Sequence, residues 1–297
     1  MNIQKSFSES SSAGPGAKGK LYLVATPIGN LEDMTFRAIR ILKEVHWIAA
    51  EDTRQTRKLL THFDIPSRTI SYHEHNKQAS GAELIRKLLA GESVAVVSDA
   101  GIPAISDPGF DLIQLAIHNS IAVVPIPGAN AALSALIVSG LSTDRFLYAG
   151  FLPRTKKKLI EELEKLKARE ETLIFYESPH RLDKTLQHIF EQWGDRQVAL
   201  ARELTKKYEE IWRGTVSQSL SWVKELAPRG EYCIVIEGRT TVEDILVRET
   251  MWDQMSLTEH VEYYFKQSGN RKEAMKKVAV DRKVSRRDVY NDLLKNP

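Results

Sequence analysis

The stretch V-S-D-A-G-I-P-A-I-S-D-P-G, from Val97 to Gly109, decides the fold class of this chain. It follows the apolar run 93–97, which is short, rich in β-branched residues and typical of a strand buried on both faces of a parallel sheet. Gly101 and Pro103 then end the strand. Ligands of open α/β sheets bind at the carboxyl ends of the strands, so the acidic and hydroxyl side chains here are placed to contact a ligand.

Strand-like runs alternate with helical segments on both sides of this stretch. The expected strands of the first half are 21–26, 47–50, 69–72, 93–97 and 121–126. The expected helices are 36–45, 54–63, 82–90 and 110–118, and a helix rich in small residues, 131–140, ends the half. Such alternation predicts right-handed βαβ units and a parallel sheet.

A second α/β set begins at Phe146. Its expected strands are 146–148, 171–176, 198–202, 211–216 and 232–236, with helices near 159–167, 182–193 and 218–226. The strands 198–202 and 211–216 leave no room for a crossover helix, which predicts antiparallel pairing and a mixed sheet. The fold class is therefore α/β, with an N-terminal α/β domain at 19–141 and a C-terminal α/β domain at 142–240.

The two ends of the chain differ from these domains. Residues 1–18 are rich in Ser and Gly and lack an apolar signal core, which predicts a disordered tail. Residues 241–297 are expected to form a basic helical appendage, with two helices joined by a short turn at 282–285. Between residues 269 and 297 there are nine basic and four acidic residues, so the appendage is a candidate contact for a polyanion.

Composition excludes several classes of protein. No run approaches the roughly 18 apolar residues that a membrane span requires, so no membrane contact is expected. The single cysteine, Cys233, excludes an internal disulfide and a cysteine metal cluster, and it fits a cytoplasmic location. His73 and His75 lack a third ligand nearby in the sequence, so no metal site is predicted.

Four strand ends of the first half share glycine, proline and small polar residues. They are T-P-I-G-N (26–30), E-D-T-R (51–54), S-D-A-G-I-P (98–103) and P-I-P-G-A-N (125–130). In a parallel sheet these ends open on one edge, where glycine lets a ligand approach the backbone and Asp or Asn accepts hydrogen bonds. Because no lysine or glycine-rich anion nest is present, the predicted ligand is small and polar, with hydroxyls, and is not a nucleoside polyphosphate.

Helix capping is the alternative explanation for part of these motifs. The S-D-P segment at 106–108 is a good helix start, and the E-D pair at 51–52 could cap the helix that begins near Thr53. Asp99 has no helix directly after it, so a binding role is favoured there. We expect 98–103 to form the ligand wall and 106–109 to start the next helix.

The motifs, taken in order, resemble the tetrapyrrole-methylase fold family. The resemblance rests on the four strand ends, on the full stretch 98–109, and on G-F-L-P-R (150–154), F-Y-E-S-P-H-R (175–181) and A-R-E-L-T-K (201–206). It runs from about Gly19 to the C-terminus, and it is closest to members that methylate small-subunit ribosomal RNA.

This resemblance implies an S-adenosylmethionine-dependent enzyme that methylates the 2′ hydroxyl of a cytidine ribose in the decoding region of 16S rRNA, either free or in the assembled 30S subunit. It also implies a homodimer, with the cofactor in the cleft between the two α/β domains. The chain departs from the usual family pattern at Asn30, at Ile102 and at 129–130. The cofactor residues implied are Pro27, Gly29, Asn30, Ser98, Asp99, Ala100, Gly101, Pro103, Pro127, Gly128, Ala129 and Asn130.

Methyl transfer to a ribose hydroxyl needs alignment of the reactants and a proton acceptor, but no metal. The candidate catalytic residues are Glu51, Asp52, Glu177 and Lys206. The C-terminal segment resembles the helix-turn-helix appendage of these methyltransferases. The candidate RNA contacts are Arg54, Arg154, Lys156, Lys157, Lys158, Arg181, Arg202, Lys207, Arg213, Arg286 and Arg287.

Two other functions remain open from the sequence. One is a methyltransferase of the same fold that acts on a tetrapyrrole or a protein side chain, but the basic segments argue against a small-molecule substrate. The other is an RNA-binding module without catalysis, which the four polar strand ends disfavour. Binding of S-adenosylmethionine distinguishes an enzyme from such a module.

Overall fold

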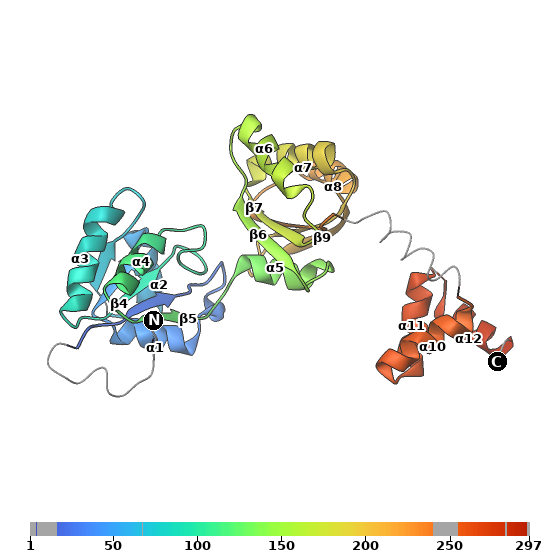
Figure 1. Ribbon diagram of the computed structural model, residues 1–297, viewed down its shortest axis with the longest axis horizontal. Coiled ribbons are helices and arrows are strands. Elements are labelled where there is room, and N and C mark those ends of the chain that lie inside the picture. Colours follow the sequence, from blue (N-terminus) through green and yellow to red (C-terminus); the bar gives the residue numbers. More distant parts are fainter. Residues whose placement is uncertain (1–3, 5–16, 67, 240–254, 283, 296–297) are drawn as a thin grey trace. The chain divides into compact units, whose positions relative to one another are not determined.

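The computed structural model describes residues 4, 17–66, 68–239, 255–282 and 284–295 (Figure 1). The chain divides into two units, Met1–Gly238 and Arg239–Pro297. The first unit holds two five-stranded sheets, and the second is helical. Most of the tail expected at 1–18 lies outside the described residues, so that expectation stays a prediction.

The first sheet is entirely parallel, as predicted. Its strands follow the order β3-β2-β4-β1-β5, and β4 is buried along its whole length between β1 and β2. The central position of β4 explains why its sequence is an unbroken apolar run. The bounds are β1 Leu21–Val24, β2 Trp47–Ala50, β3 Arg68–Ser71, β4 Val94–Val97 and β5 Val123–Ile126.

Two pairs of helices cover this sheet. Helices α1 (Phe36–Glu44) and α2 (Thr53–His62) pack on one face, and α3 (Lys77–Leu89) and α4 (Phe110–His118) pack on the other. Helix α3 begins at Lys77, earlier than the expected residue 82. Gly81 lies inside it, where an added Cβ would be 3.8 Å from side-chain atoms of Tyr72 and Leu115, so the helix continues through a residue of low helix propensity.

The expectation that the S-D-P segment caps the helix after 106–109 is wrong. Helix α4 begins after Gly109, which has φ +151°, and no side chain caps it. A Cβ at Gly109 would lie 2.9 Å from the Cβ of Ala104, so the chain folds back tightly on itself before the helix. Ser106 and Asp107 are therefore free for other contacts.

The second sheet is mixed, which confirms the prediction. Its order is β6-β7-β10-β8-β9; β6 and β7 are parallel, and the other pairs, including β8 with β9, are antiparallel. The bounds are β6 Phe146–Phe151, β7 Thr172–Glu177, β8 Gln197–Arg202, β9 Glu210–Thr215 and β10 Tyr232–Ile236.

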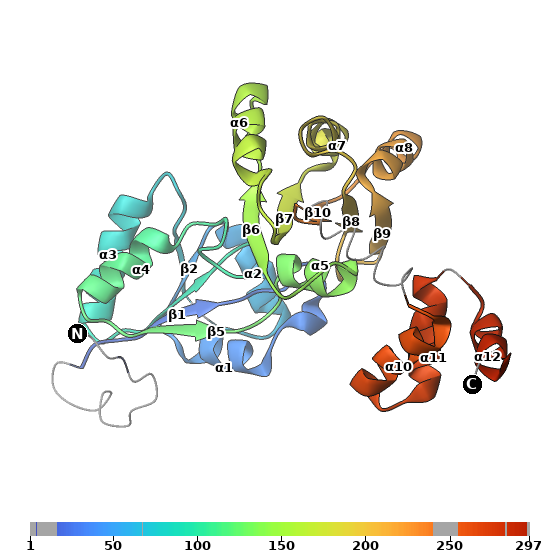
Figure 2. The same ribbon diagram turned by 45° about the vertical axis from the view of Figure 1, so that its right-hand side comes forward.

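Helices cover both faces of the second sheet as well. Helices α6 (Lys156–Leu166), α7 (Pro179–Trp193) and α8 (Val216–Leu226) pack on one face around Phe175. Helix α5 (Ala131–Ser139) packs on the other, below β7, β8 and β10 (Figure 2). The sequence assigned this helix to the domain 19–141; its contacts instead belong to the second sheet, because Ala132 and Ala135 let the helix approach that sheet closely.

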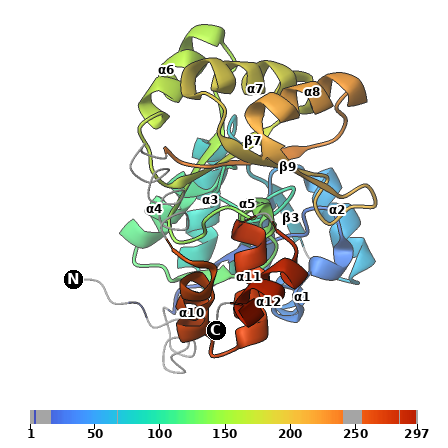
Figure 3. The ribbon, with the colours of Figure 1, turned by 90° about the vertical axis from the view of Figure 1, so that its right-hand side faces the viewer.

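The second unit is a small helical cluster, as expected for the appendage (Figure 3). Helix α10 (Leu257–Ser268) packs on α11 (Arg271–Asp281), and α12 (Arg286–Lys295) follows a short turn. Ser285 opens α12, because its Oγ accepts the N–H of Asp288 at 3.2 Å. Within the described part of the chain, no helix is both long and apolar enough to cross a membrane.

The core around β7 generates a stability prediction. Leu186 on α7 is fully buried in this core, so we expect Leu186→Ala to lower the free energy of unfolding by about 2–5 kcal/mol in urea titrations. Lys184 on the same helix is exposed, and Lys184→Ala is the control, with an expected change within about 0.5 kcal/mol. Equal losses in the two variants contradict the assigned core.

Candidate functional site

The loops that follow β1 and β4 are joined by hydrogen bonds. The N–H of Thr26 donates to the Gly101 carbonyl at 2.9 Å, and the N–H of Gly101 donates to the Thr26 carbonyl at 3.1 Å. The buried Thr26 hydroxyl donates to the Ser98 carbonyl at 3.1 Å, and Ser98 Oγ donates to the Gly101 carbonyl at 3.0 Å. Gly101 has φ +84°, which favours glycine. Two of the predicted ligand loops are thus fixed against each other.

A pocket of about 360 Å³ opens beside these loops. Its volume lies in the range of small-molecule sites. Residues from both α/β halves line it, so the cleft predicted between the halves is present. The lining includes Ile28, Asp99, Ala100, Gly101, Ile102, Ser106, Asp107 and Asn130 from the first half, and Phe151, Tyr176, Glu177, Glu203, Lys206, Glu231 and Cys233 from the second.

Two carboxylates of the first half, Asp99 and Asp107, line this pocket and interact with the nearby carboxylate of Glu51. Burial, followed by the negative charges of Glu51 and Asp99, raises the pKa of Asp107 to about 6. Burial and the charge of Asp99 also raise the pKa of Glu51 above its ordinary value, against a smaller opposite effect of His73. Among the described residues, no hydrogen bond or ion pair stabilises the ionised Asp107. This carboxylate is therefore the pocket group best suited to accept a proton near neutral pH.

The loop that carries Asp107 is strained and attached to the second half. Ala104 and Ser106 have φ +68° and +62°, values that cost free energy in residues other than glycine. Ser106 Oγ lies 2.7 Å from the hydroxyl of Tyr148 on β6, and this hydrogen bond holds the loop. A Cβ at Gly150 would approach Ser106 Oγ to 3.3 Å, so glycine there leaves room for the loop.

Two of the candidate catalytic carboxylates have structural contacts. Asp52 accepts the N–H of Arg54 at 2.8 Å and caps α2, and its side-chain hydrogen bond with Arg54 lowers its pKa to about 2. Glu177 is 2% exposed and accepts the Ser178 N–H at 2.8 Å and the Thr185 hydroxyl at 2.7 Å. Both carboxylates are therefore held in place by hydrogen bonds within the protein.

Lys206 joins the two halves. Its Nζ donates to Glu203 at 2.9 Å and to Glu231 at 2.8 Å. Burial lowers the pKa of Lys206, but the hydrogen bonds to Glu231 and Glu203 outweigh burial, so the pKa lies above its ordinary value. The aliphatic stem of Lys206 lies on Gly29, where a Cβ would collide with it. The protonated lysine thus holds the first ligand loop against the loop after β8.

The predicted cofactor residues occupy three kinds of position. Asn30 caps the short helix η2 (Leu31–Asp33) by accepting the Glu32 N–H at 3.1 Å, and Asn130 caps α5 by accepting the Leu133 N–H at 2.9 Å. Asp99, Ala100, Gly101 and Asn130 line the pocket, whereas Pro27, Gly29 and Ser98 line a second hollow that shares Asp99 with it. Pro103, Pro127, Gly128 and Ala129 are neighbours of these residues in the loops but line neither hollow.

Some of the predicted RNA contacts form hydrogen bonds or ion pairs within the protein, and the others have exposed side chains. Arg181 donates to the Leu152 and Pro153 carbonyls at 3.1 and 2.9 Å, and Arg202 donates to the Arg229 carbonyl at 2.8 Å. Arg213 donates to the Val138 carbonyl at 2.9 Å, and Arg54 pairs with Asp52. The side chains of Arg154, Lys156, Lys157, Lys158, Lys207, Arg286 and Arg287 are exposed.

Sequence reasoning missed an aromatic wall of the pocket. The rings of Phe151 and Tyr176 are 5.5 Å apart, and Tyr148 lies 5.2 Å from Tyr176. Phe151 remains 60% exposed although it lines the pocket. The motifs at 150–154 and 175–181 contain Phe151 and Tyr176. Each residue lies in its own strand segment, and neither segment alone indicates that the two rings meet.

Comparison with known proteins identifies the family. The model of the tetrapyrrole (corrin/porphyrin) methylases matches residues 20–219. The chain belongs to the tetrapyrrole methylase family. The chain is 56% identical over 274 residues to ribosomal RNA small subunit methyltransferase I of Halalkalibacterium halodurans, covering 92% of this chain and 94% of that protein. The protein of the same name from Bacillus subtilis is 53% identical over 278 residues, covering 94% of this chain and 95% of its own length. The resemblance seen in the motifs is confirmed.

A solved structure supports the fold. Uroporphyrin-III C-methyltransferase from Thermus thermophilus, complexed with S-adenosylhomocysteine, superposes with a TM-score of 0.52. The two chains are 18% identical, and the match covers 73% of this chain and 97% of the other. The predicted α/β architecture is thereby confirmed.

The bridge between the two loops can be tested by removing one hydroxyl. Thr26→Val deletes the buried donor to Ser98, so we expect the free energy of unfolding to fall by about 1–2 kcal/mol and the Gly101 amide to exchange faster with deuterium. Thr69→Val on β3 is the control, because no side-chain hydrogen bond is lost there and valine suits a strand. Unchanged exchange at Gly101 contradicts the role given to this bridge.

Proposed function

We propose that this chain transfers a methyl group from S-adenosylmethionine to the 2′ hydroxyl of a cytidine ribose in the decoding region of 16S rRNA. One observation carries the proposal. The chain aligns over 92% of its length, at 56% identity, with a ribosomal RNA small subunit methyltransferase I, and the aligned length includes the loops that form the pocket. We propose 16S rRNA, free or in the 30S subunit, as the partner and the cytoplasm as the location.

The residues present fit this cofactor. Asp99 and Asn130 offer acceptors for hydroxyl and amino groups, and Ile102 adds an apolar contact. The negative charges of Glu51, Asp99 and Asp107 favour a cationic centre over a phosphate. S-adenosylmethionine, which carries a sulfonium and no phosphate, supplies an activated methyl group when bound. Asp99 and Asn130 would hold it.

The acceptor hydroxyl must lose its proton during methylation, and a carboxylate with a raised pKa can take it. Asp107 meets this requirement, and Glu51 is the one earlier candidate that shares the upward shift. Asp52, Glu177 and Lys206 are better suited to positioning, because each is held by hydrogen bonds within the protein. We therefore assign the proton acceptor to Asp107, with Glu51 supporting it.

The second half provides features that suit a nucleotide. The exposed ring of Phe151, edge-on to Tyr176, can stack on a nucleobase, and Lys156–Lys158 can contact phosphates. These features favour RNA over a tetrapyrrole or a protein side chain. A homodimer is supported by the apolar outer face of α5, where Ile137 is 74% and Leu133 is 47% exposed.

Methylation of rRNA provides the test of the function. Purified protein is incubated with S-adenosylmethionine carrying a deuterated methyl group and with 16S rRNA or 30S subunits that lack the modification. We expect mass spectrometry of the RNA fragments to locate one labelled 2′-O-methylcytidine in the decoding region. A label found on a tetrapyrrole or on ribosomal proteins instead, or no binding of S-adenosylmethionine in calorimetry, overturns the proposal.

Replacement of Asp107 tests its catalytic role and its effect on stability by two separate measurements. The rate of methyl transfer in the wild type should rise as the pH increases through about 6, because the acceptor must be ionised. Asp107→Asn should lower kcat by about 100-fold or more and abolish this rise, with a much smaller loss of cofactor affinity because Glu51 and Asp99 keep their charges.

The same variant should be more stable than the wild type at pH 7. A folded-state pKa raised above the unfolded value means that the native state loses relative stability as the pH rises from about 4 through 6. Removing the charge should therefore raise stability by about 1 kcal/mol at pH 7, allowing for solvent screening, and change it little at pH 4. Asp183→Asn, at an exposed position on α7, is the control. A variant with normal kcat excludes Asp107 as the acceptor.

A further inference from the structure

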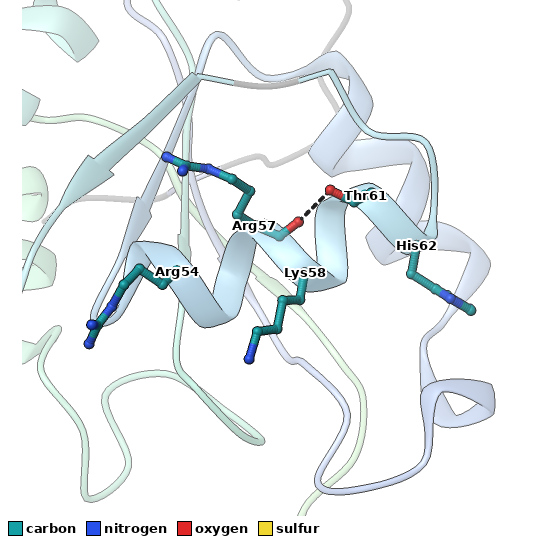
Figure 4. Close-up of a pocket in the computed structure, with 5 residues that line it drawn as sticks. All are labelled: Arg54, Arg57, Lys58, Thr61 and His62. Carbon is teal, nitrogen blue, oxygen red and sulfur yellow. Dashed lines mark hydrogen bonds between the residues drawn. The ribbon is translucent and has the colours of Figure 1, made fainter.

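Helix α2 carries a row of basic side chains on its exposed face. Its buried face holds Thr56 and Leu60, which pack toward the first sheet. The exposed surface of the helix lines a shallow hollow, and in Figure 4 Lys58 and His62 project to one side of the helix and Arg57 to the other. The residues of this hollow are Arg54, Arg57, Lys58, Thr61 and His62, and all five are exposed.

The positive charge of this face is only partly compensated. Arg54 pairs with Asp52 at 3.0 Å, and this pair carries no net charge. Lys58 Nζ donates to the uncharged Gln55 Oε1 at 3.1 Å. Among the described residues, neither Arg57 nor Lys58 forms an ion pair. Two adjacent cations thus have no acidic partner in the described part of the chain, although helix surfaces commonly pair such charges at i,i+4 spacing.

The basic face is continuous with the pocket. Lys58 and His62 also line the second hollow, together with Pro27 and Gly29 of the first ligand loop. That hollow shares Asp99 with the pocket itself. A path along the surface therefore leads from the pocket, past the ligand loop, to α2.

We propose that the exposed face of α2 binds the phosphate backbone of the RNA strand next to the nucleotide in the pocket. The inference rests on the proposed function, and it names Arg57 and Lys58 as the main contacts. A strand with one ribose in the pocket must leave across an adjoining surface. The carboxylates of the pocket repel phosphates, so attraction has to come from outside it, and α2 supplies uncompensated cations about one helical turn, roughly 5.4 Å, from Arg54 and His62.

A pair of double variants tests the proposal. Arg57→Ala with Lys58→Ala removes the two uncompensated cations. Lys43→Ala with Arg86→Ala is the control, because these exposed residues lie in the last turns of α1 and α3, which lead into the amino ends of the strands. The Kd of a fluorescent single-stranded RNA fragment from the decoding region is measured by anisotropy at several KCl concentrations. Cofactor affinity is measured by calorimetry and methyl transfer under single-turnover conditions.

We expect the α2 double variant to bind this RNA about tenfold more weakly at 0.1 M salt. Its plot of log K against log salt should be shallower by about 1.4, which corresponds to two lost contacts of about 0.7 each. The Kd of S-adenosylmethionine, the rate at saturating RNA and the free energy of unfolding should stay unchanged, and the control should match the wild type within about twofold.

The outcomes separate this inference from the proposed function. If the wild type binds the RNA but transfers no methyl group to rRNA or 30S subunits, the proposed function fails, and the salt dependence still decides the role of α2. RNA affinity equal to that of the control overturns the inference alone. So does a loss of S-adenosylmethionine affinity in parallel with RNA affinity, since this shows damage to the pocket. Absence of RNA binding by the wild type overturns both.

Discussion

The reciprocal backbone hydrogen bonds between Thr26 and Gly101 are the constraint on which the site depends. They join the loops that follow β1 and β4, which are adjacent central strands, and so restrict the conformations of both loops. From this fixed base the first half contacts the second through Lys206 over Gly29 and through Ser106 with Tyr148. Because these contacts start from loops that are already ordered, closing the pocket requires little additional loss of backbone entropy. Rigid loops also suit an in-line methyl transfer, which depends on alignment.

The pocket combines features that each reduce stability. Ala104 and Ser106 occupy left-handed backbone conformations, and Asp107 is half-buried beside two other carboxylates. Selection for stability alone would not keep such features, because asparagine at position 107 would relieve the repulsion and glycine at position 104 would relieve the backbone strain. Their joint occurrence in one loop facing one pocket is the pattern expected where chemistry sets the side-chain environment. The surrounding parallel sheet, with β4 fully buried, provides the stability that offsets these costs.

Local patterns predicted most elements, and the failures have a common cause. Apolar β-branched runs such as 94–97 marked the strands, and the short connection before β9 indicated the antiparallel pair. Helix α5 is apolar on nearly all sides, so its sequence could not show which sheet it covers. The S-D-P segment before α4 does not cap the helix, because Ser106 instead forms a hydrogen bond with Tyr148, which is distant in the sequence. The aromatic wall likewise depends on how β6 and β7 pair, which no single segment encodes.

The separation of charge between the pocket and α2 bears on substrate choice. A free nucleotide carries its phosphates into the neighbourhood of Glu51, Asp99 and Asp107, where they are repelled, and it has no neighbouring nucleotides whose phosphates could contact Arg57 and Lys58. A long RNA strand places one ribose in the pocket and several phosphates on basic surfaces. Binding at one contact then raises the effective concentration of the strand at the other contacts, which increases the overall affinity. On the proposed function, an acidic pocket beside a basic helix therefore favours a polymer over its monomers without any contact to the base.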